Sequence, residues 1–190
     1  GYLAPSGHSL EDMDIEEVKV LCIKFGIRPS RERGQNFVIE PRAIERMVEA
    51  AQLTSEDCVI EIGPGFGVLT AALAKRVNKV VAVEVDPNVL EASKYLLAEY
   101  KNVELVQGDI LKLTNERLVE LLQDISSSPS PGLRPPSPGP VLARPVFDPR
   151  GRGEGEGTLL YKVVSNLPYS ITSKVLRKFT EFEPRPSLCV

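Results

Sequence analysis

The segment Glu61-Ile62-Gly63-Pro64-Gly65-Phe66-Gly67 follows an apolar run, Cys58-Val59-Ile60, and precedes a helical pattern from Val68 to Val77. A strand, a glycine-rich turn and a helix in this order form the opening unit of a nucleotide-binding α/β sheet. Glycine lets the backbone approach a ligand closely, because no Cβ stands between them. The segment therefore predicts an α/β fold with a ligand bound near the turn.

The spacing of the glycines narrows the choice of ligand. The dinucleotide fingerprint G-x-G-x-x-G would place its third glycine at Val68, whereas this chain has Gly67. The acidic Glu61 before the turn suits a ligand with positive charge, and S-adenosylmethionine carries a sulfonium and an ammonium group but no phosphate. The turn therefore favours a methyltransferase over a nicotinamide oxidoreductase. The alternative is that these residues form a plain tight turn that binds no ligand.

The composition indicates an ordinary soluble globular protein without a strong preference for nucleic acid. The 190 residues carry a net charge of −3 with a pI of about 5.4, so RNA binding would have to depend on a local basic patch. No apolar run is long enough to cross a bilayer, and residues 1–8 do not resemble a signal peptide. Cys22, Cys58 and Cys189 are expected to be buried free thiols in a reducing compartment, and the single His8 argues against a metal site.

The first 33 residues predict an N-terminal helix followed by a basic connector. Ser9 and Asp12 suggest the start of the helix and Gly26 its end. Its spacing predicts a buried face made of Ile15, Val18, Leu21, Cys22 and Phe25. After the connector, Gly34-Gln35-Asn36-Phe37 precedes a helix that Pro41 opens, with one apolar face formed by Ile44, Met47, Val48 and Ala51.

Two acidic residues follow the next two predicted strands. Residues 79–85 predict a second strand with Glu84 near its end, where a carboxylate can accept both hydroxyls of a ribose. Asp86 is better explained as the cap of a helix that begins with Pro87. Residues 103–106 predict a third strand, and Asp109 after it could accept the exocyclic amine of an adenine.

The composition changes sharply after a predicted helix at 114–125. Residues 126–157 hold eight of the 16 prolines, which predicts a disordered insertion that cannot bury enough apolar surface to fold. Residues 161–165 then predict a fourth strand, 171–182 a helix and 184–190 the beginning of a fifth strand. The methyltransferase domain is therefore expected to span 34–190, interrupted by this insertion.

The turn Asn166-Leu167-Pro168-Tyr169 is the most specific signal in the chain. An aromatic amine such as adenine N6 is a poor nucleophile, because its lone pair is delocalised into the ring. A side-chain amide oxygen and a nearby backbone carbonyl can accept its two N–H bonds and direct the lone pair outward. Proline makes the turn rigid, and the tyrosine can stack on the base, so catalysis would depend on positioning and electrostatics.

These motifs, in this order, resemble the ribosomal RNA adenine N6,N6-dimethyltransferases of the KsgA/Dim type, which are related to the Erm resistance methyltransferases. The resemblance covers about 15–125 and 160–190. It implies a class I, Rossmann-like S-adenosylmethionine-dependent methyltransferase fold, with a mostly parallel sheet and helices on both faces. The family's last strands and its helical C-terminal domain are expected to be missing from this chain.

The resemblance also implies residue roles and partners. The cofactor would contact Gln35, Asn36, Phe37, Val38, Glu61, Gly63, Gly65, Glu84, Asp109, Ile110 and Asn166. Asn166 and the Leu167 carbonyl would hold the target amine, with Pro168 shaping the turn and Tyr169 stacking on the base. The implied protein is a cytoplasmic monomer in ribosome biogenesis, acting on adjacent adenosines near the 3′ end of small-subunit rRNA, with no metal and no membrane.

Two other functions remain open at this point. One is an Erm-type methyltransferase that acts on large-subunit rRNA. The other is a ribosome-assembly checkpoint factor, which keeps the pocket but works by occupying the immature small subunit.

Overall fold

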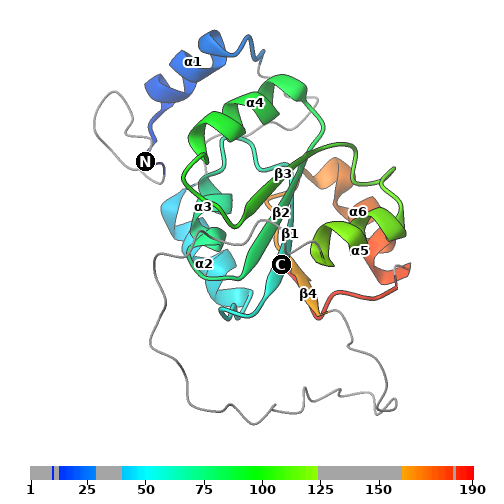
Figure 1. Ribbon diagram of the computed structural model, residues 1–190. Helices are drawn as coiled ribbons and strands as arrows, with labels where there is room; N and C mark the ends of the chain where they lie inside the picture. Colours follow the sequence, from blue (N-terminus) through cyan, green and yellow to red (C-terminus); the bar gives the residue numbers. More distant parts are fainter. Residues whose placement is uncertain (1–9, 11–12, 29–39, 124–159, 182) are drawn as a thin grey trace, which may run out of the picture.

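A computed structural model describes residues 10, 13–28, 40–123, 160–181 and 183–190 (Figure 1). The described part contains a five-stranded sheet in the order β3-β2-β1-β4-β5, and all of its neighbouring strands are parallel. This arrangement confirms the expected α/β architecture. The strands are β1 (Cys58–Ile62), β2 (Lys79–Glu84), β3 (Val103–Gln107), β4 (Tyr161–Val163) and β5 (Leu188–Cys189).

The order of the strands creates a switch point between β1 and β4. From β1 the chain moves outward to β2 and β3, and it then returns to the other side of β1 for β4 and β5. In open α/β sheets, ligands bind outside the carboxyl ends of the strands at such a reversal. The turn that follows β1 and the turn that follows β4 therefore occupy the expected position for a ligand site.

Helices cover both faces of the sheet, as Figure 1 shows. One apolar cluster joins β1 and β2 to the side that carries α1 to α4, and a second joins them to α5 and α6. Every residue of β2 is buried, as expected for a strand with helices on both sides. The helices are α1 (Ile15–Lys24), α2 (Pro41–Ala50), α3 (Val68–Ala74), α4 (Pro87–Leu96), α5 (Asn115–Gln123) and α6 (Tyr169–Glu181).

The first helix starts later than predicted. Asp14 caps α1, and its carboxylate accepts a hydrogen bond from the Glu17 amide while the Glu17 carboxylate accepts one from the Asp14 amide. Val18, Leu21 and Cys22 are buried as expected, but Ile15 is 61% exposed, so its predicted burial is wrong. Ile15 is the first residue of the helix and lies at the edge of the buried face. Ser9 and Asp12, the predicted start, lie outside the described residues.

Three further expectations need correction. The fourth strand ends at Val163, and α6 begins at Tyr169 rather than Ile171. Cys189 is exposed and Cys58 only half-buried, because β5 pairs with β4 alone in the described part and Cys58 starts its strand. The division at residue 33 and the insertion at 126–157 remain predictions, since 29–39 and 124–159 are outside the described residues. Among the described helices, none has the length and apolarity to span a membrane.

Candidate active site

The turn after β1 combines open space with close packing. Gly63 and Gly67 have φ angles of 67° and 83°, values that L side chains rarely adopt. A Cβ built on Gly63 would meet nothing within 4 Å, whereas one on Gly67 would lie 2.6 Å from Cδ1 of Leu97. A side chain at Gly67 would therefore press on Leu97 at the end of α4, whereas Gly63 faces open space.

A serine on α4 holds this turn in place. The Ser93 hydroxyl, which is fully buried, lies 2.6 Å from the Gly65 carbonyl oxygen and 2.8 Å from the Val89 carbonyl oxygen, and these two acceptors share its one proton. The sequence interpretation missed this contact. A serine four residues after Val89, on the apolar face of an otherwise helical pattern, was the available signal.

Glu61 lies near the end of β1 and is only 2% exposed. The pKa of its carboxyl is raised to about 8, mainly by burial; the Thr70 hydroxyl opposes the shift, and the charge of Glu84 adds to it. Within the described part of the chain, Oε2 of Glu61 and Oγ1 of Thr70 make no hydrogen bond. A nearby cation would favour the charged carboxylate, so this unpaired oxygen fits a ligand with positive charge.

Glu84 ends β2 beside the same turn and is 6% exposed. Its Oε1 accepts a hydrogen bond from the Asp86 amide at 2.9 Å. Burial raises the pKa of this carboxyl, and the amides of Asp86, Val85 and Gly65 oppose the shift. Asp86 caps α4 through bonds from the amides of residues 88 and 89, which confirms its predicted role. The ribose contact of Glu84 remains a prediction.

Asp109 follows β3 and helps to shape its loop. Its Oδ1 accepts from the Leu111 amide at 3.0 Å, and Nζ of Lys112 lies 3.9 Å from Oδ2. The side chain is 35% exposed, so it is accessible as the adenine contact requires. Ile110 is buried in the core under α5 and α6. The adenine contact of Asp109 and Ile110 remains a prediction.

A hydrogen bond joins the turn after β4 to the end of β1. The Ile62 amide donates to the Ser165 hydroxyl at 2.8 Å across 103 residues of sequence. The parallel register pairs Ile60 with Val163, the last residue of β4, so Gly63 and Asn166 each follow this pair by three residues. Sequence reasoning missed Ser165, because nothing local distinguishes this serine from any residue after a strand.

Contacts of its backbone hold the Asn166 turn in place, and the side chains of Asn166 and Tyr169 remain exposed. The Pro168 carbonyl accepts from the Ile171 amide and from the Thr172 hydroxyl, and Leu167 packs against the core. Asn166 is exposed, and its carboxamide has no hydrogen-bond partner in the described structure. Tyr169 is 99% exposed.

The sheet therefore brings four predicted positions to one edge. Gly63, Glu84, Asp109 and Asn166 follow the carboxyl ends of β1, β2, β3 and β4, which are neighbours in the sheet. The predicted cofactor residues Gln35, Asn36, Phe37 and Val38 lie outside the described residues. Over the described ranges, no group of three or more His, Cys, Asp or Glu side chains is arranged to hold a metal ion.

Residues 28–189 match the family model "Ribosomal RNA adenine dimethylase". Ribosomal RNA small subunit methyltransferase A of Alkaliphilus metalliredigens is 34% identical over 165 residues, which are 87% of this chain and 46% of that protein. The protein of the same name from Moorella thermoacetica is 38% identical over 80% of this chain and 43% of its own length. The chain thus spans about half the length of the curated relatives that it matches.

Solved structures share the fold. The 23S rRNA methyltransferase ErmE superposes with a TM-score of 0.53 at 25% identity, over 80% of this chain and 45% of that one. A dimethyladenosine transferase from Plasmodium falciparum gives a TM-score of 0.51 at 22% identity, over 80% and 42%. Both likenesses agree with the expected class I methyltransferase fold.

Proposed function

The chain belongs to the ribosomal RNA adenine dimethylase family, and we propose that the protein N6,N6-dimethylates adjacent adenosines near the 3′ end of small-subunit rRNA. The names of the curated relatives support the small subunit as the target. The observation that carries the proposal is the Asn166 turn. Its carboxamide, which has no partner among the described residues, and its exposed tyrosine follow β4, and β4 pairs with β1, the strand before the Gly63 turn, across the switch point of the sheet.

The residues around the glycine turn fit S-adenosylmethionine, which supplies an electrophilic methyl group on its sulfonium when bound. The open space at Gly63 and the turn at Gly65 admit the ligand, and its positive charge would favour the ionised form of Glu61, whose Oε2 has no hydrogen-bond partner among the described residues. Glu84 holds the ribose hydroxyls. Asp109, beside Ile110, accepts the adenine amine. The methionine end is assigned to Gln35, Asn36, Phe37 and Val38.

The turn after β4 prepares the adenosine for attack. The Asn166 amide oxygen and the Leu167 carbonyl accept the two N6–H bonds, so the nitrogen lone pair points away from the ring. Pro168 fixes the turn, and Tyr169 stacks on the base, which must leave its own stack to reach the site. A new N–C bond forms as the S–C bond breaks, and the proton of the methylated nitrogen passes to water. No general base is needed, because the methylated ammonium is acidic.

The partner is the immature small ribosomal subunit, which the protein meets as a monomer in the cytoplasm. A large-subunit target is the second candidate, which the likeness to ErmE supports only weakly. Mass spectrometry of rRNA from a deletion strain separates the two. Loss of dimethyladenosine from small-subunit RNA supports the proposal, and loss from large-subunit RNA supports the alternative.

The direct test measures transfer of labelled methyl groups from S-adenosylmethionine to immature small subunits by the full-length protein. Asn166→Ala is expected to lower the rate by about 10²–10³-fold, the usual cost of losing one preorganised polar contact to the reacting group. The control is Asn78→Ala, because Asn78 is exposed and precedes β2 at the opposite edge of the sheet. Equal rates for Asn166→Ala and the unmodified protein would exclude this role.

Two further outcomes are informative. If Asn166→Ala abolishes methylation but subunit maturation continues, the checkpoint role is the principal one. If calorimetry detects binding of NAD and none of S-adenosylmethionine, the proposed cofactor is wrong.

A further inference from the structure

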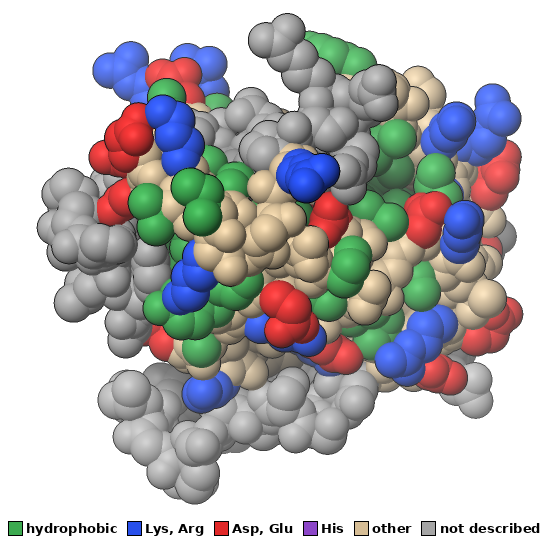
Figure 2. All heavy atoms as spheres, turned by 90° about the horizontal axis from the view of Figure 1, so that it is seen from above, with side chains coloured by type: hydrophobic (Ala, Val, Ile, Leu, Met, Phe, Trp, Pro, Cys, Tyr) green, Lys and Arg blue, Asp and Glu red, His purple; other side chains and the backbone are tan. Residues whose placement is uncertain are grey.

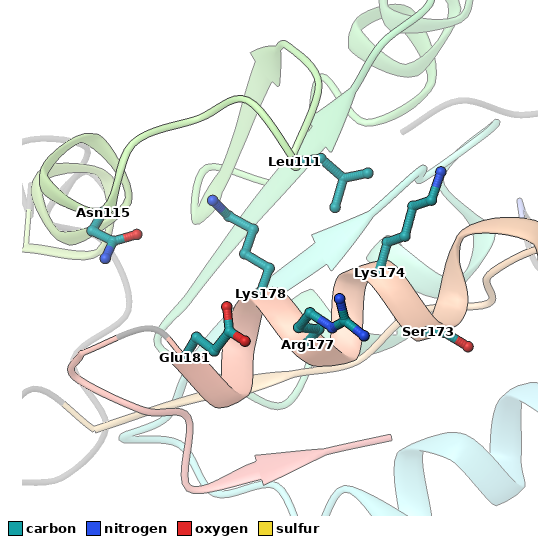
Figure 3. Close-up of a pocket in the computed structure, with 7 residues that line it drawn as sticks. All are labelled: Leu111, Asn115, Ser173, Lys174, Arg177, Lys178 and Glu181. Atoms are coloured by element: carbon teal, nitrogen blue, oxygen red, sulfur yellow. The ribbon is translucent and has the colours of Figure 1, made fainter.

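A second concavity lies beside the candidate active site, between α5 and α6. It has a volume of about 650 Å³, and its walls come from α6, the first residue of α5 and the loop after β3 (Figure 3). Lys174, Arg177 and Lys178 supply three cations to this wall, and Glu181 supplies one carboxylate. Asn115 adds an amide from α5. We call this concavity the α6 pocket.

The cations of the α6 pocket are not neutralised. Lys174 and Arg177 are exposed, and neither forms an ion pair with a described residue. Other exposed lysines differ, since Lys19 pairs with Glu16 and Lys94 with Glu91 on their own helices. The pocket therefore presents net positive charge to whatever enters it.

The overall charge of the chain gives no general attraction for a polyanion. The chain carries a net charge of −3. On the face shown in Figure 2, Lys and Arg side chains are interspersed with Asp and Glu rather than gathered into one patch. Affinity for RNA must then come from a local cluster of cations.

The α6 pocket is connected to both halves of the site. Tyr169 begins α6, and Lys174 and Arg177 follow it by roughly 7.5 and 12 Å along the helix axis. Nζ of Lys178 donates to the Leu113 carbonyl at 2.7 Å, which ties α6 to the loop that starts with Asp109. An RNA strand that places a base on Tyr169 thus passes within reach of these cations.

We propose that the α6 pocket binds backbone phosphates of the RNA next to the adenosine that enters the site. This inference rests on the proposed function, because it assumes an RNA substrate. Arginine and lysine, together with the side-chain amide of Asn115 and the hydroxyl of Ser173, are common ligands of RNA phosphates. The arginine fork can also bind a phosphate through two parallel bonds.

The test compares two double variants of the full-length protein that remove equal charge. The variant Lys174→Ala/Arg177→Ala removes two cationic side chains from the wall of the α6 pocket. Arg42→Ala/Arg46→Ala removes two exposed arginines of α2, which pair with no described acid and lie on the opposite face of the sheet. The probe is an RNA hairpin with two adjacent adenosines in its loop, and affinity is measured at several salt concentrations.

The pocket variant is expected to bind the hairpin about 25-fold more weakly at 0.1 M salt, or about fivefold per lost phosphate contact. The slope of log K against log salt should fall in magnitude by about 1.4. The α2 variant should retain nearly all of its affinity. Lys174→Arg/Arg177→Lys should recover most of the loss, which shows that charge rather than folding is responsible.

Equal losses in the two alanine variants would overturn the inference, because the effect would then be general electrostatics. Unchanged hairpin affinity in the pocket variant would overturn it as well, and loss of binding to whole subunits alone would assign the pocket to an acidic protein surface. Calorimetry with S-adenosylmethionine separates this failure from that of the proposed function. If the protein binds the cofactor and methylates RNA, and the Lys174→Ala/Arg177→Ala variant does so equally well, only the inference about the α6 pocket is refuted.

Discussion

The two sides of the switch point are built differently. On the side of β2 and α4, the carboxylate of Glu84 is 6% exposed and the glycine turn is packed against Leu97 and Ser93. On the side of β4, the strand has three residues, and Tyr169 is 99% exposed. Packing thus fixes the proposed cofactor side, while the proposed acceptor side leaves its polar and aromatic groups exposed.

The glycine turn offers the largest test of this contrast. Gly67→Ala is expected to destabilise the protein by about 2–5 kcal/mol, because it combines a left-handed backbone with a Cβ 2.6 Å from Leu97. Gly63→Ala has the same backbone cost without the clash, so about 1–2 kcal/mol is expected. Chemical denaturation measures both. Equal losses would show that packing against α4 is not what fixes the turn.

The second test concerns the buried carboxyl of Glu61. Burial raises the pKa of this carboxyl from its ordinary value of 4.5 to about 8, so between these pH values the folded state retains a proton that the unfolded chain has lost. Stability contributed by this group is therefore full below pH 4.5 and falls by about 1.4 kcal/mol per pH unit as the pH rises toward 8. Between pH 5.5 and 7.5, the loss is on the order of 3 kcal/mol.

Glu61→Gln should flatten this part of the pH profile of unfolding free energy. The raised pKa of Glu84 acts in the same direction and leaves some dependence in the variant. Glu56→Gln is the control, because Glu56 is exposed and precedes the same strand. A profile as steep in Glu61→Gln as in the unmodified protein would mean that Glu61 does not hold this proton.

On the acceptor side, we expect a substitution to lower the rate of methyl transfer while leaving stability almost unchanged. Tyr169→Ala is expected to leave the unfolding free energy within about 0.5 kcal/mol, because the side chain is 99% exposed. Methyl transfer should fall by about 10–100-fold, the effect of losing about 1–3 kcal/mol of stacking on a base. Tyr169→Phe keeps the ring and should keep most of the rate. Both rates come from labelled methyl transfer, and a strong loss of stability in Tyr169→Ala would contradict the contrast.

The smallest effect is expected from a change at Ser93, which supports the glycine turn. Ser93→Ala removes the hydroxyl bond to Gly65 and should cost about 1 kcal/mol of stability. Binding of S-adenosylmethionine should weaken several-fold, because the turn loses its contact with α4. Calorimetry measures the affinity, and Ser170→Ala, an exposed serine on α6, is the control. If the two variants bind equally well, Ser93 supports the helix but not the site.

Most elements could be predicted because their signals are local. The buried runs of β1 and β2, the caps at Asp86 and Pro41 and the turn at Gly26 each act within a few residues. The start of α1 was misplaced because two acidic capping arrangements compete there, and Asp14 is the one that the described structure contains. Element boundaries depend on such details more than the existence of an element does.

The positions of the site were predictable because parallel strands bring their carboxyl ends to one edge. The residues that support the site were not, since Ser93, Leu97 and Ser165 act through contacts with distant segments. The burial of Glu61 was missed for the same reason, because its cause is the packing around β1. The α6 pocket could not be predicted either, because its walls come from segments that only the folded sheet brings together.

The bond between Ile62 and Ser165 has a consequence for synthesis on the ribosome. The polypeptide emerges from its N-terminus, so β1, β2 and β3 are available to pair long before residue 165 is translated. A nascent chain can then pair the three strands that precede Gly63, Asp86 and Asp109 before the Asn166 turn has been synthesised. Under the proposed function, the site is complete only when β4 pairs with β1, so a chain interrupted before residue 165 would lack the turn that receives the base.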